Sequence, residues 1–215
     1  MNKIKVYIPN LENRQDRRAS IIKQFNKKNI FEINIIRPTY DRYAHKSLWK
    51  TFYDIVKKES QLNSDFFIFC EDDHVFTKFY NDSFLLEQIK IAEYLGADIL
   101  SGGMSWFETP LQVRDNIFWV DKFNGMQFTV VFNKFYHSIL SSKRDNDFIT
   151  DIHISALSDS KFVLYPYISI QKEFGYSDVT PQNNKAGYVR GMFIKSENKL
   201  YILNKVSKYY DKSFV

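Results

Sequence analysis

A continuous apolar run ends in three carboxylates and an imidazole in the segment Asp65-Phe66-Phe67-Ile68-Phe69-Cys70-Glu71-Asp72-Asp73-His74-Val75-Phe76. Strands that are covered on both faces of a parallel sheet lose the apolar/polar alternation of half-exposed strands, so the run predicts a fully buried strand. The acids then lie at its carboxyl end, where open α/β sheets bind their ligands. We therefore expect an α/β fold with a ligand site at residues 71–73.

The three adjacent acids are candidates for a metal site. Neighbouring carboxylates raise one another's pKa values, and water or a cation compensates them in a folded chain. Mg²⁺ and Mn²⁺ prefer oxygen ligands and keep positions open for phosphate oxygens. In an extended segment Glu71 and Asp73 point to one side and Asp72 to the other, which makes Glu71 and Asp73 the candidate ligands. A solvated acidic turn without an ion is the alternative, because strand ends often carry Asp for turn chemistry.

The composition is that of a soluble globular protein. The 215 residues are enough for one substantial core and few for two, so we expect a single domain over residues 1–215. Hydrophobic residues make up 44% and charged residues 26%, which is ordinary for this class. Twenty Phe and fourteen Tyr exceed what such a core needs, so some rings should line a cleft and stack on flat or sugar ligands.

The charge balance is basic, with a net charge of +5 and an isoelectric point near 9.0. It favours an anionic ligand or surface, including peripheral association with the inner face of a membrane. The sequence carries no nucleic-acid-binding signature, so we expect no nucleic-acid partner. The single Cys70 excludes an intramolecular disulfide and a thiolate metal site. With no membrane-spanning run and no signal-peptide core, the expected location is cytoplasmic, and the oligomeric state stays open.

Arginines cluster just after the first expected strand. Arg14, Arg17 and Arg18 fall in the first turn of a helix predicted over residues 13–25, where cations oppose the helix dipole. A bound anion would offset that cost, and arginine matches phosphate with two parallel donors. The cluster is therefore a candidate phosphate site, and arginines that are solvated or paired with Glu12 and Asp16 are the alternative.

Strand and helix patterns alternate over the first half of the chain, which favours a largely parallel sheet. Strands are expected at residues 3–9, 30–37, 66–70, 97–101, 117–120, 126–132 and 162–168, and helices at 13–25, 44–59, 83–95, 133–142 and 148–157. Residues 106–114 are expected to form a loop over the cleft. The pair Gly102-Gly103 would let the backbone approach a ligand closely. Residues 183–215 are expected to form a polar extension or a final helix of the same domain.

Several short motifs occur in one order over roughly residues 4–180. They are Tyr7-Ile8-Pro9-Asn10-Leu11-Glu12-Asn13-Arg14-Gln15-Asp16-Arg17-Arg18, Ala44-His45-Lys46-Ser47-Leu48-Trp49, Glu71-Asp72-Asp73, residues 125–140, and Tyr165-Pro166 with Ser177-Asp178. Together they resemble glycosyltransferase family 25, the group that includes lipooligosaccharide and collagen galactosyltransferases. The chain departs from the family pattern at Arg42-Tyr43 and Ala44, and residues after Asn183 match nothing in it.

The resemblance implies a GT-A fold, a Rossmann-like α/β domain with a mostly parallel central sheet flanked by helices. It also implies transfer of a sugar, with inversion, from a nucleotide sugar such as a UDP-sugar to a glycan acceptor, as in lipopolysaccharide synthesis. Mn²⁺ or Mg²⁺ on Glu71 and Asp73 would act as a Lewis acid on the leaving diphosphate. The donor-binding residues expected from the resemblance and the arginine cluster are Pro9, Asn10, Leu11, Arg14, Arg17, Arg18, His45 and Asp72.

Inversion needs a base that takes the proton of the acceptor hydroxyl, on the side away from the metal. The candidates are Asp151 and Asp147, which fall where a polar break leads into a predicted helix that stabilises an ionised carboxylate. Asp151 is preferred because Ile152 and Ile154 would fix its backbone against the core. Its alternative role is a simple N-cap of that helix.

Two other functions stay open at this point. One is a catalytically inactive module that binds a sugar nucleotide or a glycan. The other is a metal-dependent phosphohydrolase using Glu71 and Asp73, which would need a second group of ligands from Asp147, Asp151 and His153.

Overall fold

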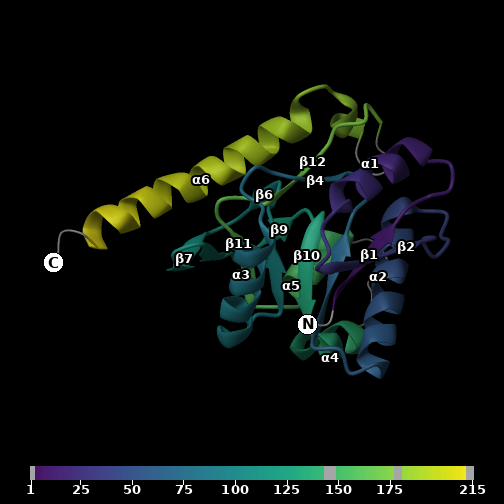
Figure 1. Cartoon of the computed structure of the whole chain (residues 1–215), viewed down its shortest axis with the longest axis horizontal. Helices are drawn as coiled ribbons and strands as arrows, with labels where there is room; N and C mark the ends of the chain where they lie inside the picture. Colours follow the sequence, from purple (N-terminus) through teal and green to yellow (C-terminus); the bar gives the residue numbers. More distant parts are fainter. Residues whose placement is uncertain (1–2, 143–148, 177–180, 212–215) are drawn as a thin grey trace.

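The structure is a computed structural model that describes residues 3–142, 149–176 and 181–211. An eight-stranded sheet forms its centre, with two further two-stranded sheets (Figure 1). The strands are β1 Ile4–Pro9, β2 Phe31–Ile36, β3 Phe66–Cys70, β4 His74–Phe76, β5 Ile99–Ser101, β6 Trp106–Phe107, β7 Leu111–Arg114, β8 Ile117–Trp119, β9 Phe123–Asn124, β10 Phe128–Phe132, β11 Lys161–Leu164 and β12 Ser169–Gln171. The helices are α1 Gln15–Phe25, α2 Ala44–Gln61, α3 Asp82–Tyr94, α4 Asn133–Ser141, α5 Thr150–Ala156 and α6 Tyr188–Asp211, with a 3-10 turn, η1, at Pro181–Asn184.

The central sheet has the strand order β2-β1-β3-β10-β5-β11-β8-β7. β2, β1 and β3 are mutually parallel, as are β5 and β11, whereas β10 and β8 run against their neighbours. Six of the eight strands therefore share one direction, and the predicted α/β class with a mainly parallel sheet is confirmed. The carboxyl ends of β1 and β3 come out side by side at one edge of the sheet.

β3 lies near the middle of the sheet and is buried on both faces. Phe67 and Phe69 point into one hydrophobic core and Ile68 and Cys70 into the other, and none of the four has measurable exposure. This is the alternation that a two-sided strand imposes on a continuous apolar run. The predicted buried strand is confirmed, and Cys70 is a buried free thiol.

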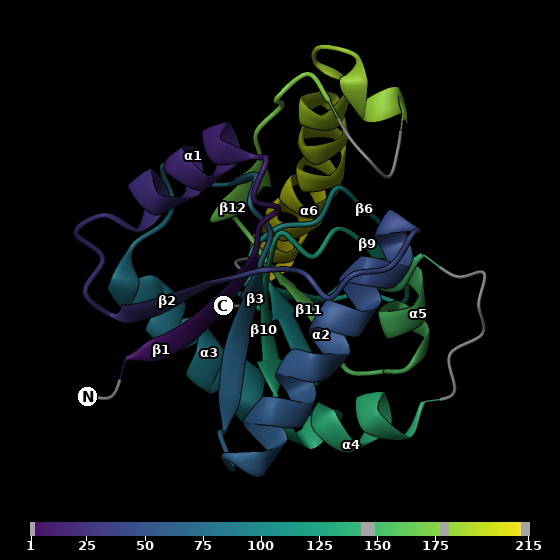
Figure 2. The same ribbon diagram turned by 90° about the vertical axis from the view of Figure 1, so that its right-hand side faces the viewer.

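Helices cover both faces of the sheet. α2, α4, α5 and α6 contribute apolar side chains to the core that contains Phe67, and α1 and α3 contribute to the core that contains Ile68. Figure 2 shows α1 and α3 on one side of the sheet and α2, α4 and α5 on the other. Each helix predicted from apolar periodicity is present, with ends within a few residues of the expected positions.

Three local expectations are wrong. Residues 106–114 contain β6 and β7, which pair with β9 and β8. The sequence did not predict them because strands of two and four residues are too short to give a periodic signal. The strand expected at residues 162–168 ends at Leu164, ahead of a proline, and the chain resumes pairing in β12. Gly103 packs against the chain and does not line the cleft described below: a Cβ at this residue would lie 2.2 Å from the backbone oxygen of Ser169.

The described part of residues 183–215 forms mainly α6, the helical alternative of the two that were expected. Val189, Phe193 and Leu200 of α6 are buried in the core that contains Phe67. From there α6 projects beyond the sheet toward the C-terminus (Figure 1). Within the described ranges, no helix is both long enough and apolar enough to cross a membrane.

Candidate functional site

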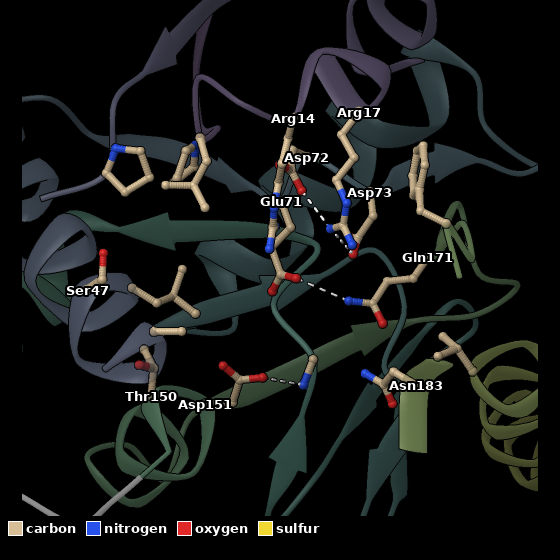
Figure 3. A pocket seen from close by; sticks show the side chains of 18 of the residues that line it. Arg14, Arg17, Ser47, Glu71, Asp72, Asp73, Thr150, Asp151, Gln171 and Asn183 are labelled. Carbon is tan, nitrogen blue, oxygen red and sulfur yellow. Dashed lines mark hydrogen bonds and ion pairs between the residues drawn. The ribbon is translucent and has the colours of Figure 1, made fainter. Parts of the chain in front are cut away.

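A cleft of about 880 Å³ opens at the carboxyl ends of β1 and β3. Its walls come from the exits of these strands, the starts of α1, α2, α5 and α6, and the end of β12. Glu71, Asp72 and Asp73 all line it, and Figure 3 shows their side chains together with Asp151 and Gln171. The acidic strand end therefore faces a cavity of the size that small-molecule sites have.

Asp72 is fixed by two donors at the base of the cleft. Asn10 Nδ2 donates a hydrogen bond to Asp72 Oδ2 at 2.9 Å, and Arg17 Nη1 donates to Asp72 Oδ1, also at 2.9 Å. All three residues are buried. These bonds join the exit of β1 to the exit of β3, so Asn10 and Asp72 hold together the two strand ends that shape the cleft.

Arg17 makes closer ion pairs with the acidic cluster than Arg14 does. Besides Asp72 it pairs with Asp73, with Nη1 lying 3.1 Å from Oδ2, and it donates to the Tyr176 backbone oxygen at 2.9 Å. The rings of Phe174 and Tyr176 lie 5.0 and 4.7 Å from its guanidinium carbon. Arg17 is thus compensated inside the chain, by Asp72 and Asp73 and not by the Glu12 and Asp16 of the alternative, so its guanidinium is a built-in counter-ion for the acids. A bound anion at the arginine cluster stays a prediction.

The carboxyls of Glu71 and Asp73 have raised pKa values. Burial raises the pKa of Asp73 to about 6, against the lowering effect of Arg17. Burial, helped by the charges of Asp73 and Asp151, holds the pKa of Glu71 well above its usual range, and a 3.1 Å hydrogen bond from Gln171 Nε2 opposes this shift. The guanidinium of Arg17 therefore neutralises only part of the negative charge that the cleft concentrates.

The donor set suits a hard divalent cation that is shared with a ligand. Asp73 Oδ1 is buried with no hydrogen-bond partner inside the described part of the chain, and Glu71 lies in the same wall. Across residues 3–142, 149–176 and 181–211, no three His, Cys, Asp or Glu side chains gather closely enough to hold an ion alone. Mg²⁺ commonly takes one or two carboxylates and completes its shell with water and substrate phosphates, so Glu71 and Asp73 fit that arrangement.

Asp151 reaches the cleft from the first turn of α5, on the other side of Glu71 from Asp72 and Asp73 (Figure 3). Its Oδ2 accepts a 2.8 Å hydrogen bond from the Gly125 backbone N–H, and burial raises the pKa of its carboxyl. Gly125 has φ +104°, a conformation that favours glycine. The N-cap of α5 is Ile149, so the alternative of Asp151 as a simple N-cap is wrong.

The other expected site residues are placed as follows. Pro9, Leu11 and Arg14 line the cleft, and Arg14 lies 3.9 Å from Asp72. Arg18 is exposed on α1 and does not line the cleft, because it lies one residue round the helix from the buried Arg17. His45 is in the first turn of α2, and only its backbone is described by the structure. Asp147 and the Ser177-Asp178 pair lie outside the described residues.

Sequence reasoning missed Gln171, Phe174 and Tyr176 as site residues, all of which line the cleft. They reach the acidic strand end from about a hundred positions further along the chain, through pairing of β12 with β4. His153, considered for a second metal group, packs edge-on against Trp49 at 4.6 Å between ring centroids. A second group of ligands for a phosphohydrolase is therefore not formed by the described residues.

A scan against protein-family models found no match, and a search of curated proteins found none either. Among solved structures, the chain is similar to A197 from STIV, with a TM-score of 0.54 over 83% of this chain and 87% of that chain at 12% identity. Fainter likenesses are to UDP-glucose pyrophosphorylase complexed with UDP-glucose (TM-score 0.46, 8% identity, 92% and 81% covered) and to a glycosyltransferase involved in glycosylation of the major capsid of PBCV-1 (0.41, 5%, 64% and 63%). The likeness to A197 shows a shared fold.

Proposed function

We propose that the protein is a metal-assisted, inverting glycosyltransferase that moves a sugar from a nucleotide sugar, a UDP-sugar in the first instance, to a hydroxyl of a glycan. The observation that carries this proposal is the arrangement of Glu71 and Asp73 on one wall of an 880 Å³ cleft with Asp151 beyond them. The order of motifs that resembles glycosyltransferase family 25 supports the same reading. The position of the cleft, beyond the carboxyl ends of the strands, is where α/β sheets bind nucleotides.

In this proposal the exit of β1 and the start of α1 hold the donor. Pro9 and Leu11 offer an apolar edge for the nucleoside, and Arg14 offers a guanidinium to the diphosphate. Glu71 and Asp73 would hold Mg²⁺ or Mn²⁺, which supplies Lewis-acid stabilisation of the leaving diphosphate when bound. The hydrogen bond between Asn10 and Asp72 would hold the donor-binding residues after β1 in place relative to the metal-binding residues after β3.

Asp151 is the proposed base for the acceptor hydroxyl. A raised carboxyl pKa brings a base closer to the pKa that general base catalysis favours near neutral pH. The hydrogen bond from Gly125 fixes one oxygen, Oδ2, and so orients the carboxylate. The cleft that Asp151 lines also receives Trp106 and Tyr188, whose rings suit stacking on a sugar.

One observation favours a second function, a nucleotide-sugar-binding module without transfer activity. Arg17 already neutralises part of the acidic cluster, as a binding site without a metal would require. The two functions differ in turnover, so a binding assay and a UDP-release assay together separate them.

The test combines thermal shift with UDP release for a panel of UDP-sugars with and without Mn²⁺. A ligand at a hundred times its dissociation constant stabilises by about 2.7 kcal/mol. For a protein of this size that is a shift of about 5–11 °C. A transferase should show a Mn²⁺-dependent shift with slow UDP release, a binding module a shift with no release, and a phosphohydrolase rapid unselective cleavage of phosphate esters.

The variant Asp73→Asn should lose the Mn²⁺-dependent shift and turnover while keeping its fold. Asp115→Asn, at an exposed turn between β7 and β8, is the matched control and should behave as wild type. Wild-type turnover in Mn²⁺ by Asp73→Asn would show that Asp73 is not a metal ligand.

A further inference from the structure

The helix α6 has two faces of different character. Val189, Phe193, Ser196 and Leu200 are buried against the rest of the protein. The opposite side is exposed along the whole helix, and α6 extends past the sheet toward the C-terminus (Figure 1). The body of the protein therefore uses only one stripe of a helix that is about 36 Å long at 1.5 Å per residue.

The exposed side of α6 carries large apolar side chains. Ile194 is 50% exposed, Tyr201 50%, Ile202 58% and Val206 48%. A helix that served only to close the fold would present polar residues there. Grouped apolar residues on an exposed face indicate an interaction surface.

The same side carries more basic side chains than α6 has acidic ones, and Glu173 lies beside Arg190 at the start of the helix. Arg190, Lys195, Lys199, Lys205 and Lys208 are exposed, and Lys199 Nζ lies 5.5 Å from the centre of the Phe107 ring. Of the two acids of α6, Glu197 accepts a hydrogen bond from the Tyr167 backbone N–H at 2.9 Å, and Asp211 is the last residue. The exposed face is thus cationic and apolar at once.

We propose that the exposed face of α6 docks on an anionic lipid surface. Helices that lie in a membrane interface combine apolar side chains, which enter the headgroup region, with Lys and Arg, which attract anionic lipids. A second copy of the chain would bring two cationic faces together, which costs Coulomb energy. Nucleic acid would pair with the cations but leave Ile194, Ile202 and Val206 facing polar backbone, so lipid is the partner that uses both features.

The test is co-sedimentation of the full chain with vesicles of phosphatidylcholine alone and of phosphatidylcholine mixed with phosphatidylglycerol. The charge variant is Lys195→Gln, Lys205→Gln and Lys208→Gln together. Each Lys near an anionic surface contributes about a fivefold change in partitioning, so three should reduce binding roughly a hundredfold. The control removes Lys23, Lys57 and Lys90, three exposed lysines on other helices, and should bind as wild type.

A second pair of variants tests the apolar half of the surface. Ile202→Gln with Val206→Gln should weaken binding at least tenfold, whereas Ile22→Gln with Leu62→Gln, exposed on α1 and after α2, should not. Raised salt should also release the wild-type protein. Equal binding of the wild-type protein to neutral and anionic vesicles would overturn the proposal, and so would unchanged lipid binding by the α6 variants. It would also be overturned if the α6 variants lost self-association or RNA binding and kept lipid binding.

Discussion

Replacing Arg17 by Met removes the guanidinium from the acidic strand end and keeps a stem that still packs near Phe174 and Tyr176. The ion pairs it makes are buried: its side chain is 8% exposed, and those of Asp72 and Asp73 are 7% and 16% exposed. Breaking a buried pair costs about 3–5 kcal/mol, because a charge is left without its partner. Since Asp73 can take up a proton, we expect the lower end, about 3 kcal/mol, or a loss of about 6–12 °C in Tm.

The loss should depend on pH in a definite direction. The pKa of Asp73 is raised to about 6 from 3.8. A carboxyl with a raised folded pKa binds its proton more tightly in the folded state, so its contribution falls as pH rises from about 4 to about 6. Arg17 opposes the raised pKa, so Arg17→Met should raise it further and extend this loss to higher pH. The difference from wild type should be largest near pH ~8 and shrink toward pH ~5.

Urea unfolding at several pH values measures this difference directly. Arg18→Met, the next residue on the same helix, is exposed and should change stability by less than about 0.5 kcal/mol. Addition of Mn²⁺ should stabilise Arg17→Met more than wild type if the ion replaces the missing guanidinium. Equal losses for the two variants, or a difference that grows as the pH falls, would refute the role given to Arg17.

Three further predictions follow from single contacts. Tyr7→Phe removes the 2.5 Å hydrogen bond from Tyr7 Oη to the buried Glu59 and should cost about 1.5–3 kcal/mol in urea unfolding, whereas an unchanged midpoint would show that the bond contributes nothing. Gly103→Ala places a Cβ 2.2 Å from the Ser169 oxygen and should destabilise by about 1–3 kcal/mol or more, which a thermal melt would detect. Asp151→Asn should keep its Tm and its affinity for UDP-sugar but lose turnover about a hundredfold or more, and near-normal turnover would move the base elsewhere.

The fold was predictable where the local pattern of apolar residues shows which side chains are buried. The continuous apolar run at residues 66–70 predicted a strand covered on both faces, and apolar spacing located the helices that cover it. What local sequence could not reveal is the direction of β10. Its sequence, Phe128 to Phe132, is apolar except for Thr129 and is buried on both sides, as a parallel strand would be. Only its pairing with β3 and β5 shows that it is antiparallel.

The site was predictable in its location and incomplete in its membership. The acids at a strand end, the arginines after the first strand and Asp151 before a helix each carry a local signal, and the structure brings Asp73, Arg17 and Asp151 to one cleft. Gln171, by contrast, carries no such signal. It reaches Glu71 because β12 pairs with β4, a contact that only the folded chain creates.

Arg17 shows why the charge of a site is harder to predict than its place. From the sequence, the acids are expected to bind a cation and the arginines an anion. The sequence does not show that these two groups compensate each other, because Arg17 and Asp72 are 55 positions apart. The parallel pairing of β1 with β3 brings the start of α1 beside the end of β3. The positive charge of Arg17 then compensates part of the negative charge of the acids. Asp73 Oδ1 has no partner in the described part of the chain and the pKa of Glu71 is raised, so the balance is incomplete. A ligand that brings both a divalent cation and phosphate would satisfy the carboxylates and the arginines together, which neither a cation nor an anion does alone.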